Sequence, residues 1–258
     1  MKKASYRPPL RQTGSQDRFT AGRRFSGSRL GRAISGLCVG LLAFAALSIL
    51  AVSVLSFVPV FITPLVAIRA VEAGFNGHQI HFSKVWVPIE DMSPSLLRAA
   101  IASEDFRFTE HNGFDFDAIE RAMRSNEQVE RKGRGRIRGA STISQQTAKN
   151  VFLFPSRTWV RKGLEAWMTI LIETIWTKRR ILEVYLNVVE IGDGVYGVEA
   201  ASRTYFHKSA KNLNASEAAL IVAVLPSPRK LRVDRPSSYL RYRQSAILRR
   251  LSYVDLPD

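Results

Sequence analysis

The pattern of hydrophobic and polar positions shows one long apolar run near the N-terminus, followed by a succession of shorter amphipathic segments. No charged residue occurs between Arg32 and Arg69, which leaves 36 uncharged positions. A helix needs about 20 apolar residues to span a bilayer, whereas the apolar region of a signal peptide is only about 7–15 residues long. The run therefore predicts a retained transmembrane anchor over residues 33–62, with Pro59 and Pro64 marking its end or a kink.

The distribution of charge predicts the orientation of this anchor. The 258 residues have a formal net charge of +16, and nine basic residues and one acidic residue lie within residues 1–32. This excess predicts a cytoplasmic N-terminus, with everything after the anchor outside the cytoplasm. The same segment is rich in Arg, Gly and Ser and has no apolar periodicity, which predicts a disordered tail.

The remainder of the chain is also basic. It contains 29 basic and 21 acidic residues, a net charge of +8. A basic body indicates anionic partners such as phosphates or lipid headgroups. Its place outside the cytoplasm argues against nucleic acid as the partner.

The only cysteine, Cys38, excludes an intramolecular disulfide framework. It lies inside the apolar run. Free cysteine in apolar surroundings usually behaves as a small hydrophobic side chain, so we expect a buried, inert thiol.

Helix start signals recur through residues 63–258, which we interpret as one mostly helical extracytoplasmic domain. Ser93 followed by Pro94 is typical of an N-cap and the first helical position. Asn214 with Glu217 predicts a capping box before an apolar run. An all-helical pattern with short connections therefore dominates the domain.

The middle of the domain has further boundary signals. Asp117 with Glu120 predicts a capping box that opens a helix at Ala118. Residues 159–191 have the periodicity of one or two helices with a broad apolar face. Residues 78–88 are interpreted as a strand or an extended connector.

The first of four polar clusters, EDFRFTEHNGFD, places Glu104 and Asp105 near the end of an apolar-faced helix, with His111 just before a glycine turn. A carboxylate at a helix end that faces a cleft can act as a general base. The alternative interpretation is a surface pair of acids beside Arg107.

The second cluster is RGASTISQQTAKN, residues 138–150. On a helix Gln145 and Lys149 share one face, and Ser141 and Thr142 lie a turn earlier. Such a donor-rich surface suits phosphate or sugar oxygens, although an amphipathic helix with an ordinary polar face fits the pattern equally well. The basic run RKGRGRIR just before it predicts a loop that folds over a bound anion.

The third and fourth clusters are RKGLE and KRRILEVYLNVVEIGDGVYG. In the third, Arg161 and Glu165 are four residues apart, the spacing of a simple ion pair on a helix. The fourth combines a basic cluster with a glycine-rich turn. Its structural interpretation is a helix whose basic end lies against a membrane surface.

Taken in this order, the motifs resemble those of the monofunctional biosynthetic peptidoglycan glycosyltransferases, which polymerise lipid II. The similarity covers roughly residues 88–233 and ends with the motif GVYGVEAASRTYFHKSAKNLNASEAALIVAVLPSP. The length and the anchor also resemble those of the monofunctional members. Where the family usually has Thr-Ile-Thr-Gln-Gln, this chain has Ser144 at the third position, which retains the hydroxyl.

The resemblance implies a bilobal, mostly α-helical fold with a lysozyme-like core after a single transmembrane helix. The implied reaction joins the reducing-end MurNAc of a lipid-linked glycan chain to the GlcNAc 4-hydroxyl of lipid II, with inversion, and releases undecaprenyl pyrophosphate. By the same resemblance Glu104 is the base for that hydroxyl. Glu165 serves the pyrophosphate, either through a divalent metal ion (Mg²⁺ or Mn²⁺) or by orienting a basic group. The expected substrate-binding residues are Ser141, Gln145, Gln146, Lys149, Asn150, Arg157, Arg161 and Lys162.

The implied partners are lipid II, the lipid-linked glycan chain and the membrane, with other cell-wall synthesis or division proteins as further candidates. The implied location is the cytoplasmic (inner) membrane, with a periplasmic catalytic domain. An apolar surface that dips into the membrane is expected near the site. For the apolar face of residues 167–176 we favour core packing over this role, given ordinary helix amphipathicity.

Two other functions compete with polymerisation. A lysozyme-like hydrolase or lytic transglycosylase would need one acid and no pyrophosphate site, so the dense Arg, Lys and Gln clusters argue against it. A non-catalytic membrane-anchored scaffold would bind anionic polymer through the basic body. Such a scaffold would not depend on the carboxylate of Glu104.

Overall fold

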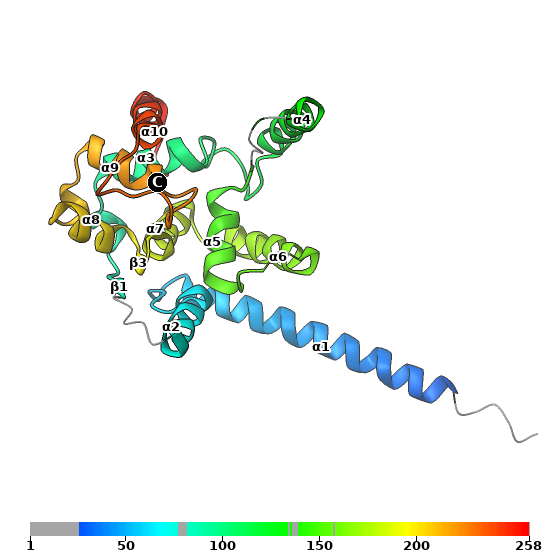
Figure 1. Ribbon diagram of the computed structural model, residues 1–258. Coiled ribbons are helices and arrows are strands. Elements are labelled where there is room, and N and C mark those ends of the chain that lie inside the picture. Colours follow the sequence, from blue (N-terminus) through cyan, green and yellow to red (C-terminus); the bar gives the residue numbers. More distant parts are fainter. Residues whose placement is uncertain (1–25, 77–81, 134, 136–138, 157, 258) are drawn as a thin grey trace, which may run out of the picture. The chain divides into compact units, whose positions relative to one another are not determined.

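The computed structural model describes residues 26–76, 82–133, 135, 139–156 and 158–257 (Figure 1). The chain divides into two compact units, Met1–Leu47 and Ser48–Asp258. Residues 1–25 of the tail predicted over residues 1–32 lie outside the described residues, so their predicted disorder stays a prediction. Residues 26–32 differ from the prediction, because they form the start of the first helix.

The first helix, α1 (Ser26–Leu55), contains residues 33–55 of the anchor predicted over residues 33–62, and residues 56–62 follow the end of the helix. Its part from Gly31 to Leu55 is long enough to cross a bilayer and includes an 18-residue stretch with a mean hydropathy of 2.6, as expected of an anchor. The helix ends ahead of Pro59, whose ring disfavours a helical residue before it. The prediction of a buried thiol is wrong: Cys38 is exposed, because none of the described residues packs closely around it.

The second unit is mostly helical, as predicted, with one small sheet. The sheet has the order β1–β3–β2, in which β1 pairs parallel to β3 and β2 pairs antiparallel to it. Of the predicted strand or connector at residues 78–88, only Ser83–Lys84 is a strand, and residues 78–81 lie outside the described residues. The elements are α2 (Pro64–Asn76), β1 (Ser83–Lys84), η1 (Ile89–Asp91), α3 (Pro94–Glu104), α4 (Phe116–Lys132), α5 (Ile143–Phe152), α6 (Trp159–Ile175), α7 (Lys178–Val188), β2 (Glu190–Gly192), β3 (Val195–Tyr196), α8 (Val198–Phe206), η2 (Ala210–Asn212), α9 (Ala215–Ala223), α10 (Ser238–Leu248) and η3 (Leu251–Tyr253).

Two helix starts predicted from the sequence are confirmed. The Ser93 side chain accepts a hydrogen bond from the backbone N–H of Leu96, and proline occupies the first position of α3. The capping box of α9 joins Asn214 and Glu217 in both directions, at 2.9 and 3.0 Å. Each cap satisfies N–H groups that the first turn of a helix leaves without partners.

The predicted start of α4 at Ala118 is wrong. Asp115 is the N-cap and accepts the N–H of Ala118, so the helix begins at Phe116. The capping carboxylate comes from Asp115, two residues before the Asp117 that the sequence pattern predicts as the cap. Residues 159–191 form two helices, because the side chain of Thr177 caps the start of α7.

Two groups of helices make up the core of the second unit. Helix α3 packs against α9 and α10, and α5 packs against α6 and α7 (Figure 1). One continuous cluster of buried apolar side chains runs through both groups. The two lobes and the lysozyme-like core implied by the resemblance stay predictions. The arrangement brings the end of α3 and the start of α5, which carry the first two sequence motifs, into the same unit.

The apolar face of residues 167–176 packs largely inside the second unit. Trp167 Nε1 donates to the hydroxyl of Ser48 at 3.1 Å, and Trp176 Nε1 donates to the carbonyl of Val52 at 2.7 Å. Leu171 is buried, whereas Ile170 is half exposed. Core packing, the favoured interpretation, therefore accounts for most of this face.

A buried amide fastens α7 to the segment that follows β1. The side chain of Asn187 is fully buried; it accepts the N–H of Val87 and donates to the carbonyl of Val87, both at 2.9 Å. It also donates to the carbonyl of Glu183. Gly197 approaches the same residue so closely that a Cβ there would lie 2.7 Å from the carbonyl oxygen of Asn187.

Replacing Asn187 with alanine removes the partners of both backbone groups of Val87. Each buried group left unsatisfied costs about 1–3 kcal/mol, so we expect Asn187→Ala to lower the free energy of unfolding by about 2–4 kcal/mol. Denaturant unfolding of the full chain in detergent measures this. The exposed Asn212 in η2 supplies the control, since Asn212→Ala should change the free energy by less than about 0.5 kcal/mol. Equal effects of the two variants would contradict a stabilising role of the Asn187 amide.

Candidate active site

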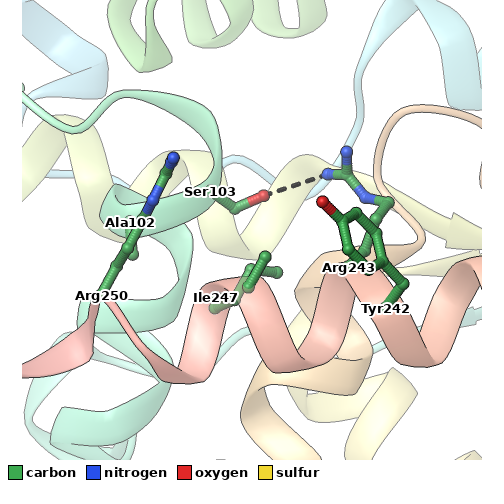
Figure 2. A pocket seen from close by; sticks show the side chains of 7 residues that line it. Ala102, Ser103, Tyr242, Arg243, Ile247 and Arg250 are labelled. Atoms are coloured by element: carbon green, nitrogen blue, oxygen red, sulfur yellow. Dashed lines mark hydrogen bonds between the residues drawn. The ribbon is translucent and has the colours of Figure 1, made fainter.

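Glu104 is the last residue of α3, and its two carboxylate oxygens are held from different sides. The hydroxyl of Ser103 donates to Oε1 at 3.0 Å, and Nε2 of Gln146 donates to Oε2 at 3.2 Å. Arg243 of α10 donates to the Ser103 hydroxyl (Figure 2), and its Nη2 lies 3.9 Å from Oε1 of Glu104. A carboxylate is disfavoured at the C-terminal end of a helix, so these donors offset the helix dipole.

The orientation of the Gln146 amide is set by a buried tyrosine. The hydroxyl of Tyr185 donates to Oε1 of Gln146 at 3.4 Å, which leaves the amide NH₂ to face Glu104 and the carbonyl of Ser141. Burial raises the pKa of Tyr185 well above its usual value. The phenol therefore keeps its proton and remains a donor.

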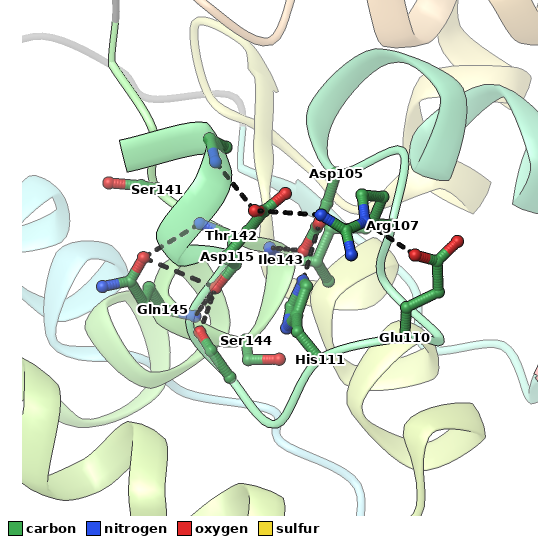
Figure 3. Close-up of polar contacts among 12 residues, drawn as sticks. Asp105, Arg107, Glu110, His111, Asp115, Ser141, Thr142, Ile143, Ser144 and Gln145 are labelled. Carbon is green, nitrogen blue, oxygen red and sulfur yellow. Dashed lines mark hydrogen bonds and ion pairs between the residues drawn. The ribbon is translucent and has the colours of Figure 1, made fainter. Parts of the chain in front are cut away.

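Asp105, next to Glu104, joins α3 to α5 (Figure 3). Its buried carboxylate hydrogen-bonds Nε2 of His111 at 2.9 Å and accepts the backbone N–H of Ile143, the first residue of α5, also at 2.9 Å. A carboxylate at the N-terminal end of a helix is stabilised by the helix dipole. This contact brings the start of α5, and with it Gln146, next to the end of α3.

The hydroxyl and amide groups at the start of α5 are mostly used within the protein. Thr142 and Gln145 form a capping box, in which the Gln145 oxygen accepts the N–H of Thr142 at 3.0 Å (Figure 3). The hydroxyl of Thr142 also donates to the carbonyl of Gly113 at 2.7 Å. Ser144 is fully buried and hydrogen-bonded to the carboxylate of Glu173. The oxygen of Gln145 is thus engaged in its own helix start.

A second cluster lies at the first turns of α6. The carboxylate of Glu165, only 3% exposed, accepts from Nη1 of Arg161 at 2.6 Å and from Nζ of Lys162. Nε of Arg161 is buried and has no hydrogen-bond partner among the described residues. The N-terminal end of a helix already carries a partial positive charge, and Arg161 and Lys162 add two cations there. Positive charge is therefore concentrated at the start of α6.

Lys149 of α5 lies within electrostatic reach of both clusters. Burial lowers the pKa of its ammonium group. Glu165 opposes this effect, Arg161 and Lys162 add to it, and Glu104 weakly opposes it. Helix α5 therefore presents Gln146 to the carboxylate of Glu104 and Lys149 to the cations of α6.

The surroundings of Glu165 do not fit a divalent metal ion. Both of its oxygens already accept hydrogen bonds from cationic side chains, Arg161 and Lys162, which would repel a metal cation. Among the described residues no group of three or more His, Cys, Asp or Glu side chains could hold a metal. The contacts are those of a carboxylate that orients two basic groups.

For the remaining residues predicted to bind substrate, the structure gives only their exposure or leaves them undescribed. Ser141 is exposed, and Asn150 is partly buried next to Lys149 on α5. Arg157 lies outside the described residues, as do three residues at positions 136–138 of the predicted basic loop. Sequence reasoning missed Ser103 and Arg243. Arg243 follows the region of motif similarity, and its surroundings on α10 give no local signal of a role.

Comparison with known proteins assigns the chain to a family. Residues 75–252 match the family described as Transglycosylase. The chain is 59% identical over 196 residues to a biosynthetic peptidoglycan transglycosylase of Bdellovibrio bacteriovorus, covering 76% of each chain. The protein of the same name from Bacteroides thetaiotaomicron is 50% identical over 214 residues, which cover 83% of this chain and 84% of the relative. That of Salmonella arizonae is 52% identical over 201 residues, which cover 78% of this chain and 81% of the relative. The chain therefore belongs to the transglycosylase family.

Proposed function

We propose that this protein polymerises peptidoglycan glycan chains from lipid II. It transfers the lipid-linked glycan chain to the GlcNAc 4-hydroxyl of an incoming lipid II and releases undecaprenyl pyrophosphate. The observation that carries this proposal is the placement of α5 between a held carboxylate, Glu104, and the cations of α6. The names of its relatives, biosynthetic peptidoglycan transglycosylases, support the same reaction.

The acceptor side of the reaction belongs to Glu104. Its carboxylate takes the proton of the 4-hydroxyl while that oxygen forms a bond to C1 of the donor MurNAc. Ser103 and Gln146 each hold one oxygen of the carboxylate, so its direction is fixed before the substrate arrives. A positioned general base typically contributes about 10²–10⁴-fold to the rate.

The leaving-group side belongs to the cations around Glu165. As the C1–O bond breaks, negative charge accumulates on the pyrophosphate, and preorganised donors stabilise it most strongly in a site that excludes water. Lys149, Arg161 and Lys162 supply these donors, and the start of α6 adds the positive end of its dipole. Glu165 orients Arg161 and Lys162 without neutralising the whole cluster.

The two alternatives are less well supported by the same geometry. A hydrolase needs an acid that protonates a sugar oxygen and has no use for a cluster of cations beside a leaving group. A scaffold has no use for a carboxylate held by two separate donors. The biosynthetic names of the relatives favour synthesis over either alternative.

The proposed location is the cytoplasmic (inner) membrane, with α1 as its single span and the catalytic unit in the periplasm. Just ahead of the cations of α6 along the chain come three exposed apolar side chains, Phe154, Trp159 and Val160, of which Trp159 is 92% exposed. An aromatic and aliphatic patch beside a phosphate-binding cluster suits the boundary between headgroups and acyl chains. The polyprenyl tail of the substrate would then remain in the bilayer while its pyrophosphate reaches Arg161.

Replacing Glu104 with glutamine removes the base but keeps the size of the side chain. We expect Glu104→Gln to lower the rate of polymerisation of purified lipid II by at least about 100-fold, with an unchanged melting temperature. The length of the glycan product on gels and the rate of lipid II consumption measure this. Glu110→Gln, at an exposed carboxylate six residues on, is the control and should retain the wild-type rate. Full activity of Glu104→Gln, or shortening of finished glycan by the wild type, would overturn the proposal.

The lowered pKa of Lys149 predicts the alkaline limit of the reaction. Below its pKa the ammonium group is charged and binds the pyrophosphate, and the charge is lost as the pH rises through a pKa lower than that of an ordinary lysine. Arginine stays protonated to pH of about 12, so Lys149→Arg should move the alkaline fall in kcat/KM upward by about one pH unit or more. A pH profile of lipid II consumption tests this, with Lys230→Arg, at an exposed lysine outside the site, as the control that should leave the alkaline limb in place. An unmoved alkaline limb in Lys149→Arg would contradict the role of Lys149.

A further inference from the structure

We propose that Arg243 of α10 is a positioning residue for Glu104, acting through the hydroxyl of Ser103. This inference rests on the proposed function, because it concerns the carboxylate that serves there as the base. It assigns a role in the chemistry to the C-terminal helix, which lies beyond the sequence motifs.

The guanidinium of Arg243 is anchored before it reaches the carboxylate. Its Nε donates to the carbonyl of Ala223, the last residue of α9, at 3.1 Å. Its Nη2 donates to the hydroxyl of Ser103 at 3.3 Å (Figure 2) and lies 3.9 Å from Oε1 of Glu104. The hydroxyl in turn donates its proton to the same Oε1 at 3.0 Å. A fixed cation and a polarised hydroxyl therefore act on one oxygen.

Arg243 supplies a positive charge on one side of the Glu104 carboxylate, whereas the other side has only a neutral amide. Oε2 is held by Gln146, whose amide is neutral, and Glu104 stands at the negative end of the α3 dipole. The guanidinium of Arg243 places a fixed positive charge 3.9 Å from Oε1, which attracts that oxygen and helps to hold the carboxylate in one orientation. Only 25% of the Arg243 side chain and 13% of the Glu104 side chain are exposed, so solvent screens the pair weakly.

A cavity beside the pair makes this role accessible to experiment. It has a volume of about 330 Å³, and the side chains of Ser103 and Arg243 form part of its wall (Figure 2). The other lining residues are Ala102, Tyr242, Ala246, Ile247 and Arg250. A small planar cation can therefore reach the place of the guanidinium when the Arg243 side chain is removed.

The alternative is that Arg243 only fastens α10 to α9 through the carbonyl of Ala223. The two roles predict different results for Arg243→Ala in full-length protein. Positioning predicts that kcat for lipid II polymerisation falls at least about tenfold while KM changes less than about twofold, since the interaction acts on the base and not on substrate binding. Added guanidinium chloride at millimolar concentration should restore part of kcat. Arg241→Gln, an exposed arginine on the same helix, should behave as wild type.

Ser103→Ala tests the same contact without touching the bond between Arg243 and α9. We expect kcat to fall several-fold, and the double variant to be no slower than Arg243→Ala alone, because both residues act on one oxygen. Unchanged kcat in Ser103→Ala and Arg243→Ala, or a lowered melting temperature with no response to guanidinium, would overturn the inference. If Arg243→Ala fails to fold, wild-type kcat in Ser103→Ala alone overturns it and a several-fold lower kcat supports it. Absence of polymerisation by the wild type would instead refute the proposed function.

Discussion

The site depends first on the buried carboxylate of Asp105. It accepts the N–H of Ile143 at the start of α5 and hydrogen-bonds His111 in the loop that follows α3. A hydrogen bond from a helix N-terminus to a carboxylate combines a charge-assisted contact with a favourable dipole interaction. Together with the hydrogen bond from the Thr142 hydroxyl to the carbonyl of Gly113, it holds the first motif against the start of α5 and so brings together Glu104 and Gln146, which are 42 positions apart along the chain.

Helix α5 then carries the residues proposed to serve the two halves of the reaction. Its buried side fixes the helix in place, through the capping box of Thr142 and Gln145 and through Ser144, which bonds the carboxylate of Glu173. Lys178 holds the same carboxylate at 2.9 Å and donates to the carbonyl of His111 at 2.5 Å. The loop after α3, the start of α5 and the end of α6 are thus one connected polar network. Gln146 and Lys149, three residues apart on one face of the helix, then lie toward Glu104 and toward the cations of α6, respectively.

The sequence was sufficient for features that rest on local interactions. The anchor follows from hydropathy, and the caps at Ser93 and Asn214 follow from side-chain to backbone bonds within one turn. The pairing of Glu165 with Arg161 follows from helical spacing. The role of Glu104 came from the resemblance to a family, because the chain around it does not distinguish a base from a surface acid.

The remaining features depend on contacts between distant segments. Gln145 and Gln146 are adjacent and chemically identical, yet Gln145 caps its own helix, as its spacing from Thr142 allows, and Gln146 holds Glu104. The contacts of Gln146 with Glu104 of α3 and Tyr185 of α7 join distant segments, so the residues around it in the sequence do not reveal them. Arg243 reaches Ser103 across 140 positions of the chain, so no local pattern could reveal it. The start of α4 was predicted wrongly because the local sequence offers two caps, Asp115 and Asp117, and does not decide between them.

The central claim is a division of labour, in which one carboxylate serves the acceptor and the cations of α6 serve the departing pyrophosphate. Calorimetric titration of inorganic pyrophosphate into the full-length chain in detergent tests it most directly. The account predicts that Arg161→Gln weakens binding about tenfold or more, as expected for a lost charge-assisted contact, whereas Glu104→Gln binds within about twofold of the wild type. Equal weakening by both substitutions, or wild-type affinity in Arg161→Gln, would contradict it.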